Sequence, residues 1–289
     1  MIQVAVVSGK GGTGKTVLTA SLAGLLPGDK VLIDADVDAA NLSLLLNPSA
    51  PVSQEFRGME GAVIAADRCT GCGICKEACV FDAIREAGDV YEVVPYRCEG
   101  CGTCTIVCPE DAVNMNSRVT GMIHHATTSA GPLFYGSLVP GAGNSGLLVH
   151  KLRQEAGLRY PGASLVLIDG PPGIGCPLIS AITGIQSAVL VTEPSKSAHS
   201  DLIRLIRLCR SFNVRMFLVI NRSDINPDIT NDIIHVATEN NIQVLGSIPY
   251  DRTVLNATRQ GVPVTLMTGP ASEAIFQIAQ NLSEEITKL

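Results

Sequence analysis

Short apolar runs recur along this chain, and most of them end in a polar turn. Each consists almost entirely of apolar residues, a pattern typical of strands that are buried on both faces of a parallel sheet. These runs are residues 2–7, 31–33, 165–168, 188–191, 216–220 and 243–248. Residues 17–26 and 271–289 have the apolar spacing of helices instead. The alternation predicts an α/β fold in which a mostly parallel sheet is flanked by helices.

A glycine-rich turn joins the first run to the first helical pattern. Residues 9–16 fit the motif GxxxxGK[ST] completely. Backbone N–H groups of such a turn, with the positive end of the following helix, bind phosphate. Lys15 can reach the β and γ phosphates, and Thr16 can place its hydroxyl on Mg²⁺. The sequence therefore predicts a nucleotide site at Gly11, Gly12, Thr13, Gly14, Lys15 and Thr16.

Carboxylates follow two of the predicted strands. Asp36 and Asp38 come shortly after residues 31–33, and Asp169 comes directly after residues 165–168. The carboxyl ends of parallel strands lie beside the ligand in folds of this class, so these side chains are candidates for catalysis. Helix capping is the alternative for Asp38, which would precede a helix over residues 39–46, and less so for Asp36.

Composition limits the function classes. The chain has 289 residues, a net charge of −6 and a pI near 5.4, so no basic surface for nucleic acid or anionic lipid is evident in bulk. The first strand begins at residue 2, which leaves no room for a signal peptide. We expect a cytoplasmic protein without a stable membrane anchor, since the final helix lacks a basic amphipathic face.

Eight of the ten cysteines form two runs that repeat with a period of 29 residues. Each run reads CxxCxxCxxxC, and flanking Gly, Asp and Ala residues repeat as well. This spacing resembles a bacterial two-cluster ferredoxin, in which the fourth cysteine of each run ligates the other cluster. Structural zinc is the alternative, but zinc sites use paired CxxC units. The resemblance implies two [4Fe–4S] clusters, one held by Cys69, Cys72, Cys75 and Cys108, the other by Cys98, Cys101, Cys104 and Cys79.

The repeat interrupts the α/β pattern, which resumes after it. We predict an inserted small α+β ferredoxin domain over residues 61–117 and an ATPase domain from residues 1–60 and 118–289. Such an insertion is tolerated when its two ends lie close together.

The motif KGGTGKT, which contains Lys10, resembles the deviant Walker A sequence of the MinD/ParA superfamily of P-loop ATPases. The resemblance implies ATP-dependent homodimerisation, with Lys10 crossing to the phosphates of the second subunit. It further implies that Asp36 holds the Mg²⁺ shell, Asp38 orients the attacking water and Asp169 is the switch II aspartate. For the base, it implies an adenine contact from Asn221, with Arg222 and Pro249 nearby.

The nitrogenase iron protein belongs to the same superfamily and bridges its dimer with a cluster. Cys176 stands seven residues after Asp169, as a bridging cysteine does there, but Asn144 occupies the place of the second ligand. We therefore expect Cys176 near the dimer seam without a bridging cluster, or simply buried as a small apolar residue.

Three functions follow from this combination of features. The leading hypothesis is a Mg²⁺-dependent ATPase whose dimerisation gates electron transfer between its two clusters and a redox protein partner. The second is a scaffold or carrier for iron–sulfur cluster assembly, which requires open, labile ligation. The third is a positioning or maturation ATPase in which the clusters sense redox state or stabilise the fold.

Overall fold

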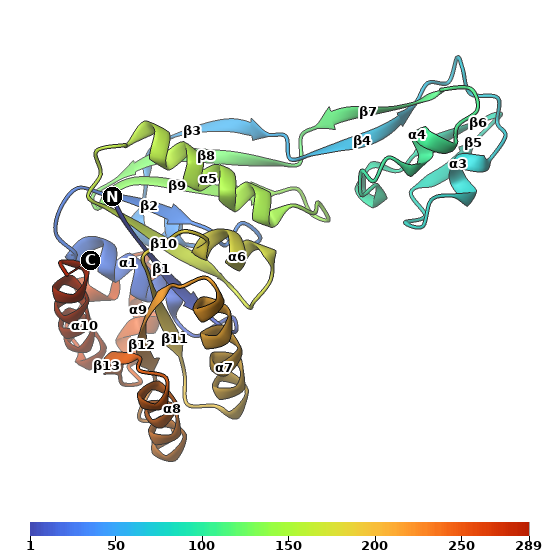
Figure 1. The fold of residues 1–289 in the computed structure, drawn as a ribbon. Coiled ribbons are helices and arrows are strands. Elements are labelled where there is room, and N and C mark those ends of the chain that lie inside the picture. Colours follow the sequence, from blue (N-terminus) through green and yellow to red (C-terminus); the bar gives the residue numbers. More distant parts are fainter. Residues whose placement is uncertain (289) are drawn as a thin grey trace. The chain divides into compact units, whose positions relative to one another are not determined.

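A central sheet organises the larger part of the computed structural model, which describes residues 1–288 (Figure 1). Within those residues the sheet has nine strands in the order β13-β12-β11-β1-β10-β2-β9-β8-β3. Every neighbouring pair from β13 to β9 is parallel. The strands are β1 (Ile2–Ser8), β2 (Lys30–Asp34), β3 (Ser49–Phe56), β8 (Gly121–Thr128), β9 (Gly131–Leu138), β10 (Leu165–Pro172), β11 (Ser187–Thr192), β12 (Arg215–Asn221) and β13 (Gln243–Ile248).

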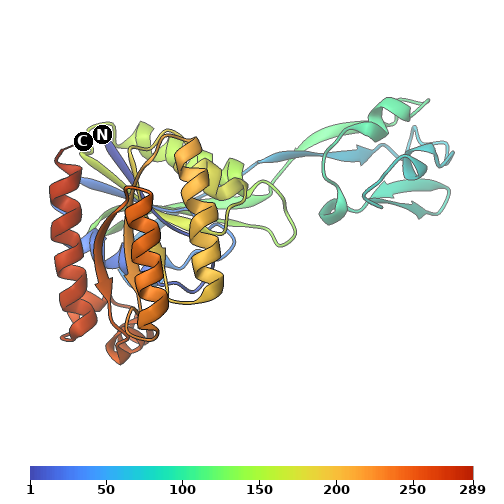
Figure 2. The same cartoon turned by 60° about the horizontal axis from the view of Figure 1, so that its bottom comes forward.

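Helices cover both faces of this sheet. One layer contains α1 (Lys15–Leu25), α2 (Leu42–Leu46), α9 (Arg252–Gln260), the short η2 (Val264–Leu266) and α10 (Pro270–Ile286). The other contains α5 (Ser145–Arg159), α6 (Cys176–Ile182), α7 (Lys196–Ser211) and α8 (Pro227–Glu239). Helices α8 and α10, for example, pack on opposite sides of β13 (Figure 2).

The apolar runs form strands because both of their faces are buried. Val4 and Val6 of β1 belong to the core shared with α1 and α10. Ala5 and Val7 alternate with them and are equally inaccessible, so they face the second helical layer. The predicted α/β class with a mostly parallel sheet is confirmed, and within residues 1–288 no helix has the length and apolarity to cross a bilayer.

The described chain divides into two units. The first, called the sheet unit, comprises Met1–Ser53, Ile123–Ser137 and the residues from Ser145 onward. The second, called the cysteine unit, comprises Gln54–Met122 and Leu138–Asn144. It contains the whole of the predicted insert together with short flanks on either side.

Small elements build the cysteine unit. Strands β4 (Met59–Ile64) and β7 (Val113–Arg118) pair antiparallel, as do β5 (Ile84–Ala87) and β6 (Val90–Val93). Between them lie α3 (Ile74–Glu77), η1 (Pro95–Arg97) and α4 (Thr103–Val107), and α3 packs against α4.

The sequence repeat is also a backbone repeat. Gly71 and Gly100 have φ angles of 70° and 67°. A Cβ at either position would lie 2.4 Å from a backbone carbonyl oxygen, so only glycine fits. Asp82 and Asp111, also 29 positions apart, have φ angles of 49° and 47°. The two runs of cysteines are therefore presented by nearly the same local conformation.

Candidate functional site

A pocket of about 680 Å³ lies at the carboxyl ends of the parallel strands in the sheet unit. This is the expected ligand position for an open α/β sheet, and the volume suits a nucleotide-sized molecule. Most of the predicted nucleotide residues line it, namely Gly11, Gly12, Gly14, Lys15, Thr16, Asp36, Asn221, Arg222 and Pro249. Tyr250 and Asp251, which follow Pro249 in the same turn, line it as well, and so does Leu44, which was not predicted.

Asn221, the last residue of β12, holds the glycine-rich turn in place. Gly14 has a φ angle of 92°, and a Cβ there would lie 2.5 Å from Nδ2 of Asn221. That amide nitrogen donates a hydrogen bond of 2.8 Å to the carbonyl oxygen of Thr13. Asn221 thus connects the end of β12 to the turn, and Thr13 itself is buried rather than part of the pocket lining.

Buried charges meet at the amino end of α1. Asp169 is 1% exposed, and its Oδ1 accepts a hydrogen bond of 2.9 Å from Thr19 Oγ1. Burial raises the pKa of Asp169 to about 6. Burial also lowers the pKa of Lys15, although the carboxylates of Asp169 and Asp36 oppose that shift. Oδ2 of Asp169 is buried without a hydrogen-bond partner among the described residues, so it is available to a ligand or its water shell.

Asp34 is a buried carboxylate that we did not predict. Its Oδ1 accepts from the backbone N–H of Asp36, and its Oδ2 accepts from that of Leu42 at 2.9 Å. Burial, together with the neighbouring Asp169, raises the pKa of Asp34 well above its usual value. The side chain therefore holds the segment that presents Asp36 to the pocket.

The structure contradicts the capping alternative for Asp38. Helix α2 begins at Leu42, with Asn41 as its N-cap residue, so the predicted helix over 39–46 is too long and Asp38 does not cap it. Asp38 is exposed and lies outside the pocket lining. Asp36, by contrast, is half-buried within the lining.

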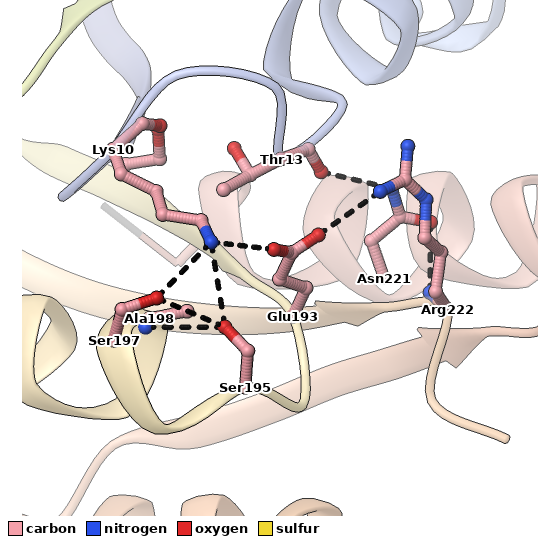
Figure 3. A network of polar contacts seen from close by, with 9 residues as sticks. Lys10, Thr13, Glu193, Ser195, Ser197, Ala198, Asn221 and Arg222 are labelled. Atoms are coloured by element: carbon pink, nitrogen blue, oxygen red, sulfur yellow. Dashed lines mark hydrogen bonds and ion pairs between the residues drawn. The ribbon is translucent and has the colours of Figure 1, made fainter. Parts of the chain in front are cut away.

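Lys10 is held by a network of polar contacts at the end of β11 (Figure 3). Its Nζ lies 2.7 Å from Oε1 of Glu193 and donates to the hydroxyls of Ser195 and Ser197 at 3.4 and 3.3 Å. The second oxygen of Glu193 lies 3.0 Å from Nη1 of Arg222. Glu193 thus joins Lys10 to a residue of the pocket lining, and no sequence motif identified it beforehand.

The eight repeated cysteines gather into two groups within the cysteine unit. One small cavity is lined by Cys69, Cys72, Cys75 and Cys108, and a second by Cys79, Cys98, Cys101 and Cys104. Each group takes three thiols from one run and the last thiol of the other run. All of these cysteines are free thiols, and within residues 1–288 no three metal-binding side chains converge on a single-ion site. The thiols instead surround a space, as ligands of a multi-atom group do.

The last cysteine of each run, Cys79 or Cys108, belongs to the group of the other run, and we call its sulfur the crossing sulfur. A backbone N–H group donates a hydrogen bond to each crossing sulfur. Sγ of Cys79 accepts from the N–H of Ala83 at 3.4 Å, and Sγ of Cys108 accepts from the N–H of Ala112 at the same distance. Such hydrogen bonds stabilise thiolates. The donor set of four convergent thiols, with an amide N–H at the crossing sulfur, therefore fits a [4Fe–4S] cluster in each cavity.

A model of the CobQ/CobB/MinD/ParA nucleotide binding domain matches residues 4–264. The chain belongs to this family. The resemblance drawn from KGGTGKT is confirmed for the nucleotide-binding part, and the chain is a P-loop ATPase of the MinD/ParA kind.

Similar proteins show how far the similarity extends. An uncharacterized protein of Methanocaldococcus jannaschii is 35% identical over 288 residues, covering 99% of this chain and 98% of its own. The septum site-determining protein MinD of Pyrococcus horikoshii, solved with Mg-ADP, has a TM-score of 0.60 at 20% identity and covers 97% of this chain and 95% of that chain, which shows a common fold. An iron–sulfur cluster carrier protein of M. jannaschii is 27% identical over 134 residues, covering 42% of this chain and 46% of its own.

Cys176, which we expected near a dimer seam or buried, is exposed at the start of α6 in this MinD/ParA-type fold. Burial as a small apolar residue is therefore wrong. The reason is local: Cys176 occupies the first position of a helix that buries Leu178, Ala181 and Ile182 instead. Cys209 is the inaccessible cysteine of the sheet unit, and burial raises the pKa of its thiol to about 12.

Proposed function

We propose that this protein is an ATP-hydrolysing iron–sulfur protein whose nucleotide-dependent dimerisation is coupled to electron transfer through two [4Fe–4S] clusters. One observation carries the proposal. In a chain that has a P-loop pocket, eight thiols form two crossed sets of four around two cavities. Four thiolates saturate one cubane, and saturated cubanes suit electron transfer better than cluster release.

On the nucleotide side, the residues of the pocket divide the work. The N–H groups of the glycine-rich turn and Nζ of Lys15 bind the phosphates, while Thr16 and Asp36 hold Mg²⁺ and its water shell. Asp169 couples the γ phosphate to the segment that follows β10. Lys10 reaches the phosphates of a second copy of this chain, whereas Asp38, exposed in this structure, stays a prediction as the residue that orients water.

On the cluster side, the thiolates of the two sets would hold the iron, and each cluster would take up or release one electron. The exposed Cys72 and Cys101 lie on the outer side of the two cavities. They mark the places where a redox protein partner would approach, since electron transfer needs a short path to the surface. Asn221, Arg222 and Pro249 would contact adenine at the other site.

An anaerobic redox titration with and without ATP and Mg²⁺ tests the proposal. We expect about eight irons and eight sulfides per chain, and cluster potentials that shift when ATP and Mg²⁺ are added. Lys15→Ala is the matched control, because it should keep the iron and abolish the shift. Zinc in place of iron would contradict the clusters, and potentials that ignore ATP would contradict the coupling.

A cluster carrier is the second candidate. The similarity to an iron–sulfur cluster carrier protein over 134 residues favours it. Mixing the loaded protein with an apo-ferredoxin distinguishes the two functions: a carrier transfers its iron and sulfide within minutes, whereas an electron-transfer protein retains them.

A further inference from the structure

The two halves of the cysteine repeat differ beside the second cysteine of each run. Thr103 begins α4 and Ile74 begins α3, and these positions are 29 residues apart, which is the period of the repeat. Each follows a glycine in the left-handed conformation, Gly73 with a φ angle of 80° and Gly102 with 75°. The backbone before the two side chains is therefore alike, and only the side chain changes.

The Thr103 hydroxyl makes a contact that Ile74 cannot make. Its Oγ1 lies 3.4 Å from Sγ of Cys101. A thiolate that ligates iron has no proton, so the hydroxyl must be the donor in the loaded protein. The side chain of Ile74 has no polar atom to offer to Cys72. Among the residues that the structure describes, no other side-chain hydroxyl makes a hydrogen bond to a sulfur of the eight cysteines.

The carboxylates near the two cavities are balanced. One glutamate lines each cavity, Glu110 the first and Glu99 the second. Tyr91 lines the first cavity, but its hydroxyl donates to Glu86 at 3.3 Å rather than to a sulfur. The amide donors to the crossing sulfurs are equal in length at both sites. Thr103 is therefore the side chain that distinguishes the two sites by a hydrogen bond to a ligating sulfur.

We infer that Thr103 gives the cluster at Cys98, Cys101, Cys104 and Cys79 a higher reduction potential than its neighbour has. This inference rests on the proposed function. Reduction adds one negative charge to the cluster and its thiolates, and a hydroxyl donor at a sulfur stabilises that charge. The first electron that enters the protein therefore resides at the Cys101 site, which makes that site the acceptor end of the pair.

Potentiometric titration of the anaerobically prepared full-length chain, followed by electron paramagnetic resonance, tests the inference. Dithionite supplies one electron to each cluster and is itself oxidised. We expect two reduction steps in the unaltered protein. Thr103→Val keeps the branched shape and removes the donor, so it should lower the upper step alone, changing the reduced-to-oxidised ratio at a fixed potential by about fivefold.

Three further variants serve as controls. Thr103→Ser retains a hydroxyl and should leave the upper step in place. Ile74→Thr adds a donor to the other site and should raise the lower step, while Ile74→Val should leave both steps unchanged. Both positions are exposed in the structure, so none of these substitutions disturbs a core.

The outcomes separate this inference from the proposed function. A chain that carries no iron and sulfide overturns both. A loaded chain in which Thr103→Val leaves the upper step unchanged, or moves the lower step instead, overturns the inference alone. An equal shift in Thr103→Ser and Thr103→Val also overturns it, because packing rather than the donor would then set the potential.

Discussion

The two units of this chain are stabilised in different ways. The sheet unit has 16 acidic and 15 basic residues, whereas the cysteine unit has 11 and 6, so most of the net charge of −6 belongs to the smaller unit. The largest fully buried side chains, such as Phe134, Phe217 and Leu18, all belong to the sheet unit. In the cysteine unit, by contrast, Val80 and Ile106 are 87% and 84% exposed.

The two units therefore depend on different sources of free energy to fold. Buried apolar area is the main favourable term for the sheet unit, which is large enough to supply it. The cysteine unit has short elements, little core and an excess of negative charge, so its own burial is a weak driving force. Small domains of this kind usually depend on disulfides or metals. Its free thiols make a bound metal group the natural source of that stability.

Removal of iron should have the largest effect, and this effect should be confined to the cysteine unit. We expect chelation under reducing conditions to unfold the cysteine unit while the sheet unit keeps its structure, because in the function we propose only the former is held by ligated thiols. Hydrogen exchange measured by mass spectrometry should show residues 61–117 losing protection by about a hundredfold or more. Peptides from β1, β10 and β11 serve as the internal control. Unchanged protection in residues 61–117 would mean that this unit folds by its own packing.

Lys15→Ala should weaken ATP binding in the sheet unit and leave the iron content of the cysteine unit unchanged. The charge-assisted hydrogen bonds from Lys15 to phosphate are worth about 1.5–3 kcal/mol, so we expect ATP affinity to fall by about 10- to 100-fold. Isothermal titration calorimetry measures the affinity, and iron analysis of the same sample should give an unchanged value. Lys151→Ala, on the outer surface of α5, is the matched control. A loss of iron in Lys15→Ala would show that the units are not independent in folding.

Asp169 gives the sheet unit a stability that depends on pH. Its pKa is about 6 in the fold, above the unfolded value of 3.8, so the folded state binds more protons between these values. The free energy of unfolding attributable to Asp169 therefore falls as pH rises from about 4 to about 6, and it is constant above that range.

Asp169→Asn removes this titration. The free energy of unfolding of the variant, relative to that of the unaltered protein, should therefore increase by about 1–3 kcal/mol as pH rises from 4 to 7. Urea denaturation of the nucleotide-free protein at several pH values measures the difference. The exposed Asp232→Asn, on α8, is the control and should give a constant difference. A constant difference for Asp169→Asn as well would mean that this carboxylate is not desolvated in the fold.

Patterns in the sequence predicted the features that depend on repeated physical requirements. Buried strands must be apolar on both faces, and a phosphate turn must have glycine at set positions. The sheet could therefore be predicted, and Gly11, Gly12, Gly14, Lys15 and Thr16 line the pocket as expected. The helix over 39–46 was wrong because the buried Asp34 binds the N–H of Leu42 and keeps the preceding residues out of the helix. Nothing in the local sequence indicates such a tether, which depends on where β2 lies in the sheet.

Contacts between distant segments could not be predicted from the sequence for the same reason. Glu193 and Lys10 are 183 positions apart, and an acidic residue after a strand has no motif that assigns it a partner. The grouping of Cys79 with the second run of cysteines was accessible only through the resemblance to two-cluster ferredoxins. The exposure of Cys176 likewise depends on which face of α6 packs against the sheet.

The smallest expected effect concerns Glu193 and is confined to the sheet unit. If Lys10 crosses to the phosphates of a second subunit, as we propose, its ion pair with Glu193 must first break. A partly exposed pair of this kind is worth about 0.2–1 kcal/mol. Glu193→Gln keeps the size of the side chain and removes its charge, so the free-energy cost of releasing Lys10 falls.

We therefore expect Glu193→Gln to form dimers at an ATP concentration about two- to fivefold lower than the unaltered protein requires. Sedimentation velocity over a series of concentrations of a non-hydrolysable ATP analogue measures this midpoint. Glu155→Gln is the matched control, because it makes the same substitution and removes the ion pairs with Lys151 and Arg159 on α5 without changing the ion pair of Lys10. If Glu193→Gln instead requires more nucleotide, the carboxylate orients Lys10 for its task in the dimer rather than restraining it, and the network of Figure 3 is part of the assembled site.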